Sequence, residues 1–288
     1  MSGAEKNPFQ GEDTGHEWDG IRELKNDPPR WWMISLYLSG IWMIAYFLLY
    51  PSIPLISSYT KGLLGWTSIN EYKEDMAEVA AIRAPFEQKI KDMTAKAILN
   101  DQEMAQFAIA SSKVLFGDNC APCHGAAGEG TSIFPILIDD VWLYGGDIND
   151  IVQSIAEGRQ GNMPGFKNDL SETELNDVVK YVEGLASGNI YEPGQKVFRG
   201  ESEAEAGCAD CHGVDAKGSK DVGAPNLSDN IWRFGSSTED IRLTILHGVN
   251  QEGDPETRSA VMPSFGDKLS ETQINKLAVK VYLFGGGQ

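Results

Sequence analysis

The chain has 288 residues, of which 41% are hydrophobic and 23% are charged, and its formal net charge is −18. This length suggests about two domains, and the composition is ordinary for a folded protein. The acidic charge argues against a nucleic-acid partner, because phosphates are bound by Lys and Arg. It is compatible with a basic partner or with solubility alone.

An apolar segment over residues 31–60 contains no charged side chain. Its part up to Tyr50 is about 20 residues long, enough for a helix to cross a hydrocarbon core of about 30 Å. Pro51 and Pro54 would end a regular helix there. A signal peptide would start nearer the N-terminus, be shorter and finish at a small-residue cleavage site. We therefore expect an uncleaved transmembrane anchor over 31–57.

Basic residues flank this anchor unevenly. Arg22, Lys25 and Arg30 precede it, whereas only Lys61 follows it closely. The bias of basic residues toward the cytoplasmic side predicts that the N-terminal tail, residues 1–30, lies in the cytoplasm. The long segment after the anchor would then lie on the outer side of the membrane.

A spacer is expected over residues 58–103. Most of it, residues 69–101, is charged and free of Gly, which predicts helix. Pro85 interrupts this stretch, so we expect two helical pieces that separate the anchor from the following domains.

From about residue 104 onward the chain repeats itself. Each copy has a Cys-x-x-Cys-His motif, a Trp, a Met-Pro dipeptide and a Leu-Ser-Glu-Thr stretch, in that order, and the second copy has an insertion at 251–259. We assign two copies of one small domain to 104–188 and 189–288. The Leu-Ser-Glu-Thr stretches predict helix starts capped by Ser or Thr. No sustained strand alternation is present, so the fold class is mainly α.

The four cysteines of the chain all lie in the two motifs, and a histidine follows each pair. The residues are Cys120, Cys123 and His124 in the first copy and Cys208, Cys211 and His212 in the second. Disulfides would not explain the histidines, a thioredoxin-like site needs a βαβ setting, and structural zinc usually gathers two separated ligand pairs. Covalent c-type haem uses all three residues, the thiols on the porphyrin and the His on the iron. The sequence therefore predicts two covalently bound haem c groups.

A second axial ligand for each iron is predicted at Met163 and Met262, which occupy equivalent repeat positions and each precede a Pro. A lone Met is more often a packing residue, but here the repeat register and the Met-Pro pairing favour ligands. His/Met ligation suits a respiratory carrier because it raises the reduction potential. His247 is a rival ligand, but its repeat counterpart is Glu157, so we expect it to pack or to lie near a propionate. His16 precedes the anchor, away from either haem.

No catalytic constellation accompanies the haem motifs. Two six-coordinate irons leave no position for a substrate, so the predicted function is electron transfer. Trp142, Trp232 and Arg159 are expected to line haem edges or propionates.

The stretch Gly15–Trp32, the single anchor, the helical spacer and two haem c domains with "MPGF" and "MPSF" together resemble the diheme subunit (CcoP or FixP type) of cbb3-type cytochrome c oxidases. The resemblance covers essentially the whole chain. It implies one N-terminal transmembrane helix followed by two tandem class I cytochrome c-like domains. It also implies a bacterial inner-membrane location with the haem domains in the periplasm.

The resemblance further implies partners and ligand roles. Electrons would pass from a cytochrome c donor, through these haems and those of a monohaem cytochrome c subunit, to a haem–copper catalytic subunit in a proton-translocating complex. The chain would then be no enzyme on its own. The repeat suggests that each domain supplies its own Met ligand, whereas members of the family exchange them. One departure is Gly165 after the first Met-Pro, where the second copy has Ser264.

Three other functions remain open at this point. The chain could be an independent diheme carrier or the cytochrome subunit of a periplasmic dehydrogenase, although neither has an evident need for the N-terminal stretch. A diheme peroxidase would need one iron with an open or displaceable sixth position. A haem-based sensor is disfavoured, because no output module remains in the chain.

Overall fold

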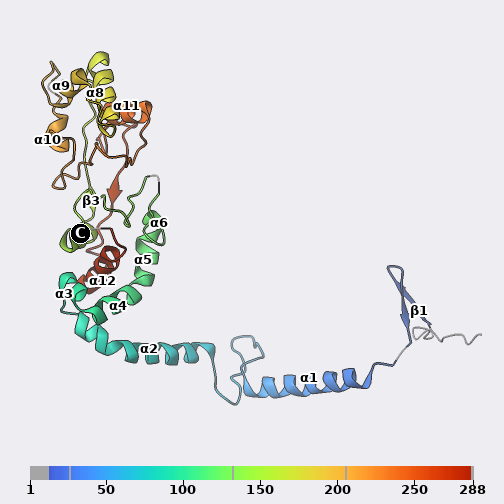
Figure 1. Ribbon diagram of the computed structural model, residues 1–288. Coiled ribbons are helices and arrows are strands. Elements are labelled where there is room, and N and C mark those ends of the chain that lie inside the picture. The colour runs from blue at the N-terminus through green and yellow to red at the C-terminus, as the bar shows by residue number, and fades with distance from the viewer. Residues whose placement is uncertain (1–12, 26, 132, 205, 287–288) are drawn as a thin grey trace, which may run out of the picture. The chain divides into compact units, whose positions relative to one another are not determined.

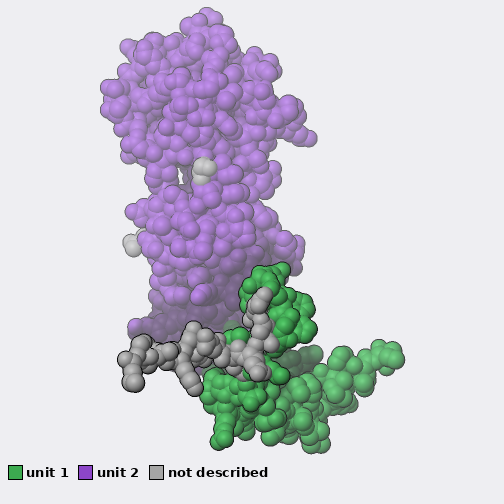
Figure 2. Space-filling model, turned by 90° about the vertical axis from the view of Figure 1, so that its right-hand side faces the viewer, with its two compact units in different colours: residues 1–83 green, residues 84–288 purple. Residues whose placement is uncertain are grey.

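The computed structural model describes residues 13–25, 27–131, 133–204 and 206–286. Of the predicted N-terminal tail, residues 1–12 and residue 26 lie outside this description. The chain divides into two compact units, Met1–Arg83 and Ala84–Gln288 (Figure 2). The described part is mainly helical with one candidate transmembrane helix, as the sequence predicts.

A short hairpin precedes the anchor. Strands β1 (Asp13–Trp18) and β2 (Ile21–Leu24) pair antiparallel, with Trp18 opposite Ile21. The two connecting residues, Asp19 and Gly20, have φ of 51° and 85°. This conformation matches the tight two-residue turn for which Asp-Gly is a common sequence signal. This hairpin was not predicted from the sequence, although the Asp-Gly pair marks it.

The anchor is helix α1 (Arg30–Leu49), whose 20 residues include none that is buried in the chain. It is shorter than the predicted segment 31–57, because the backbone is extended at Tyr50, before Pro51. Beyond Pro51 the chain folds back, and Leu63 donates its backbone N–H to Leu48 at 2.9 Å. The ring of Tyr50 lies 5.6 Å from that of Trp66, which gives the C-terminal end of the helix an aromatic cluster typical of a membrane interface.

The expected break at Pro85 is wrong, because helix α2 (Ser68–Ile90) continues through that residue. A proline inside a helix costs about 3 kcal/mol. Packing of the following turn opposes this cost: Phe86 stacks on Phe107 with ring centroids 5.2 Å apart, and Ile90 is fully buried. The break falls instead just after Ile90, and Thr94 caps the next helix.

Residues 84–288 contain the remaining helices and a second two-stranded sheet (Figure 1). The helices are α3 (Ala95–Asn100), α4 (Gln102–Ser111), α5 (Lys113–Asn119), α6 (Ala121–His124), α7 (Ile148–Glu157), α8 (Glu172–Leu185), α9 (Glu192–Phe198), α10 (Cys208–His212), α11 (Thr238–His247) and α12 (Glu271–Tyr282). The strands β3 (Arg159–Gln160) and β4 (Val261–Met262) pair antiparallel.

Two hydrophobic cores divide this unit into two lobes. Lobe 1 contains α3–α7 together with α12, and lobe 2 contains α8–α11 (Figure 1). Helix α12 follows the second motif in the chain but packs on α3, α4, α5 and α7 of lobe 1. Helix α8 follows the first motif but packs on α9 and α11 of lobe 2. The lobes therefore do not coincide with the two sequence copies, 104–188 and 189–288. Each lobe contains the last helix of the other copy.

Both exchanged helices start as the sequence predicts. Ser171 caps α8 and Ser270 caps α12, and each forms a capping box with the residue three positions later, Glu174 or Gln273. The box satisfies two N–H groups that have no partner within the helix. The Ser of each Leu-Ser-Glu-Thr stretch is thus confirmed as the cap.

Candidate haem sites

The first motif lies on a single helical turn. Cys120 precedes α6, the backbone N–H of His124 donates to the Cys120 carbonyl at 2.9 Å, and Gly125 ends the helix with φ of 79°. The His124 Nδ1 atom lies 2.9 Å from the carbonyl oxygen of Pro135. A carbonyl only accepts hydrogen bonds, so Nδ1 carries the proton and Nε2 keeps its lone pair. This is the tautomer that a metal-ligating histidine needs.

The second motif repeats this arrangement. His212, the last residue of α10, is 8% exposed, and its Nδ1 lies 3.1 Å from the Pro225 carbonyl oxygen. Gly213 ends the helix with φ of 77°. Burial lowers the pKa of both His124 and His212. Each imidazole is therefore neutral at neutral pH and available as a ligand.

The carbonyls of Pro135 and Pro225 were not identified by sequence reasoning. Both residues follow their motifs by a similar distance, and each lies two residues before a Leu, at Leu137 and Leu227. Proline has no backbone N–H, but its carbonyl is a full acceptor. A comparison of the two copies for a shared Pro-x-Leu would have found them.

The four cysteines form no disulfide. Burial raises the pKa of both Cys120 and Cys208 to about 11, so both thiols are protonated at neutral pH. Cys123 and Cys211 lie one helical turn later in the respective motifs. Two free thiols three residues apart on one turn match the attachment chemistry of haem c.

The two methionines lie on the segments that connect the lobes. Met262 in β4 packs on the lobe 1 core, as do Cys120 and Trp142. Met163 packs on the lobe 2 core, as do Cys208 and Trp232. Each methionine therefore packs on the same core as the cysteine motif of the other copy.

Backbone pairing fixes both methionine segments. Met163 exchanges two backbone hydrogen bonds with Val249, at 3.0 and 2.9 Å. Met262 lies opposite Arg159 in the β3–β4 pair. Each methionine is thus held in extended backbone beside the chain of the other copy.

Two cationic side chains of the lobes, Arg159 and Arg233, are partly buried. Arg159 donates from Nε to the Ser154 hydroxyl at 3.0 Å, and its guanidinium lies 5.0 Å from the centre of the Tyr144 ring. Arg233 is half-buried, burial lowers its pKa, and its positive charge helps to lower the pKa of His124. Among the residues that the structure describes, no carboxylate forms an ion pair with Arg233.

An unpaired, partly desolvated guanidinium favours an anion. The propionate groups of a haem supply that charge, so the donor set around His124 fits haem c in its polar as well as its covalent part. Arg233 was not identified from the sequence, because a single Arg after Trp232 carries no periodic or motif signal.

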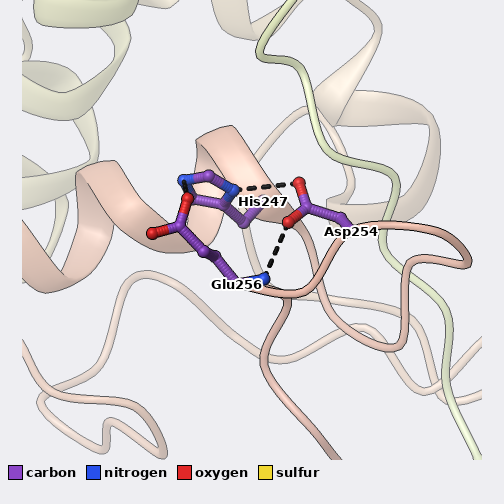
Figure 3. A group of neighbouring side chains, drawn as sticks. All are labelled: His247, Asp254 and Glu256. Carbon is purple, nitrogen blue, oxygen red and sulfur yellow. Dashed lines mark hydrogen bonds and ion pairs between the residues drawn. The ribbon is translucent and has the colours of Figure 1, made fainter.

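His247 forms a different polar cluster. It is 5% exposed, and its Nδ1 and Nε2 lie 2.9 and 3.4 Å from carboxylate oxygens of Asp254 and Glu256 (Figure 3). Because a carboxylate lies against each ring nitrogen, neither nitrogen of His247 is free to face an iron. His16 lies in β1 of the N-terminal unit.

Two family models match the chain. The N-terminal domain of cytochrome oxidase-cbb3, FixP, matches residues 10–57, and cytochrome c oxidase, cbb3-type, subunit III, matches residues 107–182 and 195–279. The matched segments contain the anchor helix and both Cys-x-x-Cys-His motifs.

Several curated proteins are similar over nearly the whole chain. The cbb3-type cytochrome c oxidase subunit FixP of Azorhizobium caulinodans is 41% identical, covering 96% of this chain and 93% of the relative. FixP of Bradyrhizobium diazoefficiens is 39% identical, covering 96% and 95%. The subunit CcoP of Cereibacter sphaeroides is 36% identical over the same shares. The chain therefore belongs to the family of FixP and CcoP subunits of cbb3-type cytochrome c oxidases.

Proposed function

We propose that this chain carries two covalently bound haem c groups and passes electrons from a cytochrome c donor toward the haem–copper subunit of a cbb3-type oxidase. The observation that carries the proposal is that each lobe contains a neutral histidine, with its Nε2 lone pair free, and a methionine from the other copy. His and Met together are the axial ligands of electron-carrying c-type haems.

We assign each iron the histidine and the methionine that lie in the same lobe. His124 and Met262 belong with the haem attached to Cys120 and Cys123 in lobe 1. His212 and Met163 belong with the haem attached to Cys208 and Cys211 in lobe 2. The packing of each methionine on the core of the opposite copy supports the exchanged assignment.

The haems supply one-electron redox chemistry, and the chain supplies orientation and electrostatics. The Pro135 and Pro225 carbonyls hold the His rings in one tautomer and one orientation. Arg233 and Arg159 would bind propionates, and Trp142 and Trp232 would cover haem edges. Six ligands on each iron would leave no position for a substrate, so the chain would be no enzyme on its own and oxygen reduction would belong to a partner subunit.

Helix α1 provides the membrane anchor. The excess of basic residues before it supports a cytoplasmic N-terminus. The haem lobes would then lie in the periplasm of a bacterial inner membrane, beside the monohaem cytochrome c subunit and the catalytic subunit. This arrangement provides a route for electrons from a periplasmic donor into the complex.

The test is a cofactor count on tagged chain purified gently from membranes. We expect two covalent haems per chain, with b-type haem, copper and cytochrome c-dependent oxygen consumption in the same preparation. Two covalent haems without copper or b-type haem, under conditions that keep membrane complexes intact, would instead identify an independent diheme carrier. A resting high-spin ferric signal would contradict two six-coordinate irons and indicate a peroxidase.

A further inference from the structure

One side chain, Asn250, contacts both segments that carry the methionines. Its Nδ2 group donates to the Gly161 carbonyl at 2.6 Å and to the Ala260 carbonyl at 2.9 Å. Its Oδ1 atom accepts from the backbone N–H of Ala260 at 3.0 Å. Gly161 lies two residues before Met163, and Ala260 lies two residues before Met262.

The backbone of Asn250 suits this bridging position. Its φ is 53°, in the left-handed region that Asn adopts more readily than most residues. Its own N–H donates to the Arg258 carbonyl at 2.7 Å, which closes the loop formed by the insertion 251–259. The side chain is half-buried. The three hydrogen bonds of the Asn250 side chain link it to Gly161, which is distant in the sequence, and to Ala260, on the other side of this loop.

The loop has a second attachment at His247, three residues before Asn250. Asp254 and Glu256, both in the insertion, contact opposite nitrogens of the buried His247 ring, and Asp254 also accepts from the Glu256 backbone N–H at 2.8 Å (Figure 3). The arrangement is thus a hydrogen-bonded brace that holds the insertion against the end of α11.

We propose that Asn250 is a positioning residue for both methionine ligands, so that the two Met–iron bonds depend on one side chain. This inference rests on the proposed ligand sets. Asn250 ties the chain before Met163 to the chain before Met262, and the insertion keeps Asn250 in place. The first copy has no such insertion, so one loop serves both haems.

The hydrogen bonds predict an unequal effect on the two sites. Loss of the side chain removes two hydrogen bonds to Ala260 and one to Gly161. Loss of one hydrogen bond changes an equilibrium constant about fivefold. The Met262 segment should therefore loosen more than the Met163 segment, and both should loosen.

The test uses Asn250→Gly in the full haem-loaded chain, because Gly adopts positive φ without strain. Imidazole displaces Met from ferric haem, and loss of the far-red Met–iron absorption band reports this displacement. Met262→His leaves only the Met163 band, and Met163→His leaves only the Met262 band. Each site can thus be titrated with imidazole separately.

We expect Asn250→Gly to raise the apparent imidazole affinity about fivefold at the Met163-ligated haem and by more at the Met262-ligated haem. Asn250→Asp, which keeps the acceptor for Ala260 but loses both donated bonds, should also affect both sites. The matched control is Gln160→Gly, because Gln160 is the repeat counterpart of Asn250 and its side chain is exposed. The control should change either affinity by less than Asn250→Gly does.

An unchanged affinity at either haem in Asn250→Gly would overturn the shared-positioning role. So would an equal effect of Gln160→Gly. If Met163 and Met262 were not the iron ligands, the result would look different: the far-red band would survive both Met→His substitutions made together. The same set of variants therefore distinguishes failure of the Asn250 role from failure of the methionine ligation.

Discussion

The ends of α7 and α11 occupy the same place in the two copies but carry different chemistry. Both helices have ten residues and are followed by a glycine with positive φ, Gly158 and Gly248. At the last helical position, Glu157 is exposed and pairs with Arg159 at 3.6 Å, whereas His247 is buried between two carboxylates. The scaffold that presents each methionine is thus repeated, and the second copy adds a brace beside it.

This difference shows which parts of the repeat carry the common function. The attachment turn, the His–carbonyl hydrogen bond and the capped final helix are present in both copies. The asymmetric parts are concentrated in residues 248–260, which connect the lobes. Both proposed haems would require the first set of features, whereas the second set distinguishes the two sites and joins them.

The largest expected effect comes from removing one attachment motif. Cys120→Ser with Cys123→Ser should reduce the covalent haem content from two per chain to one, because thioether bonds need both thiols of the pair. The matched pair, Cys208→Ser with Cys211→Ser, should give the same stoichiometry. Haem staining of the denatured chain together with a pyridine haemochrome assay measures the number of covalent haems per chain. Retention of two covalent haems in either variant would contradict the attachment sites.

A core substitution tests the exchange of the final helices. Leu277 in α12 is fully buried in lobe 1, and Leu175 in α8 is 1% exposed in lobe 2. Leu→Ala at such positions costs about 2–5 kcal/mol. Leu277→Ala should therefore destabilise the lobe that contains His124, and Leu175→Ala the lobe that contains His212.

Hydrogen exchange measured by mass spectrometry locates the loosened lobe in each of these variants. Peptides around α4 and α5 should exchange faster in Leu277→Ala, and peptides around α9 and α11 in Leu175→Ala. The reverse pattern would show that each final helix packs with its own copy.

A smaller effect is expected at the helix caps. Ser270→Ala and Ser171→Ala each remove a hydroxyl that accepts a backbone N–H, at 3.3 Å in both helices. The expected loss is about 1 kcal/mol for each, measured by denaturant unfolding. Thr173→Val changes an exposed residue just inside α8 without removing the cap and serves as a control. A loss as large as that of Leu277→Ala would contradict a purely local capping role.

The smallest effect concerns pH and the His247 brace. The Glu256 backbone N–H and the His247 ring lower the pKa of Asp254 below its ordinary value of 3.8. A carboxyl with a lowered pKa stabilises the folded state above pH 3.8, and this contribution is lost as the pH falls through the lowered value. The difference in Tm between the wild type and Asp254→Asn should therefore shrink below pH 3.8. A difference independent of pH would exclude an ionic contribution from Asp254.

Much of this structure could be predicted from local sequence. The apolar run predicts α1, the Ser of each Leu-Ser-Glu-Thr stretch predicts a capped helix, and the motifs predict the short turns that hold their cysteines. These signals are local because helix starts, tight turns and membrane spans depend on residues within one or two turns. The continuation of α2 through Pro85 could not be predicted, since distant packing at Phe86 and Ile90 opposes the cost of the proline.

The assignment of each methionine to a lobe also lay beyond the sequence pattern. Two similar copies contain the same apolar spacing whether the final helix packs on its own copy or on the other. The difference depends on the path of residues 158–165 and 248–264, where pairings such as Met163 with Val249 join positions 86 residues apart. No periodicity reports such contacts, and Asn250 is recognisable only once they are known.

The most direct measurement uses a chain with a single haem. In the Cys208→Ser, Cys211→Ser background only the haem held by Cys120, Cys123 and His124 remains. There, Met262→His should abolish the far-red Met–iron band and lower the midpoint potential by about a few tenths of a volt. Met163→His should leave both unchanged. Loss of the band in Met163→His, with the band intact in Met262→His, would contradict the exchanged ligand sets.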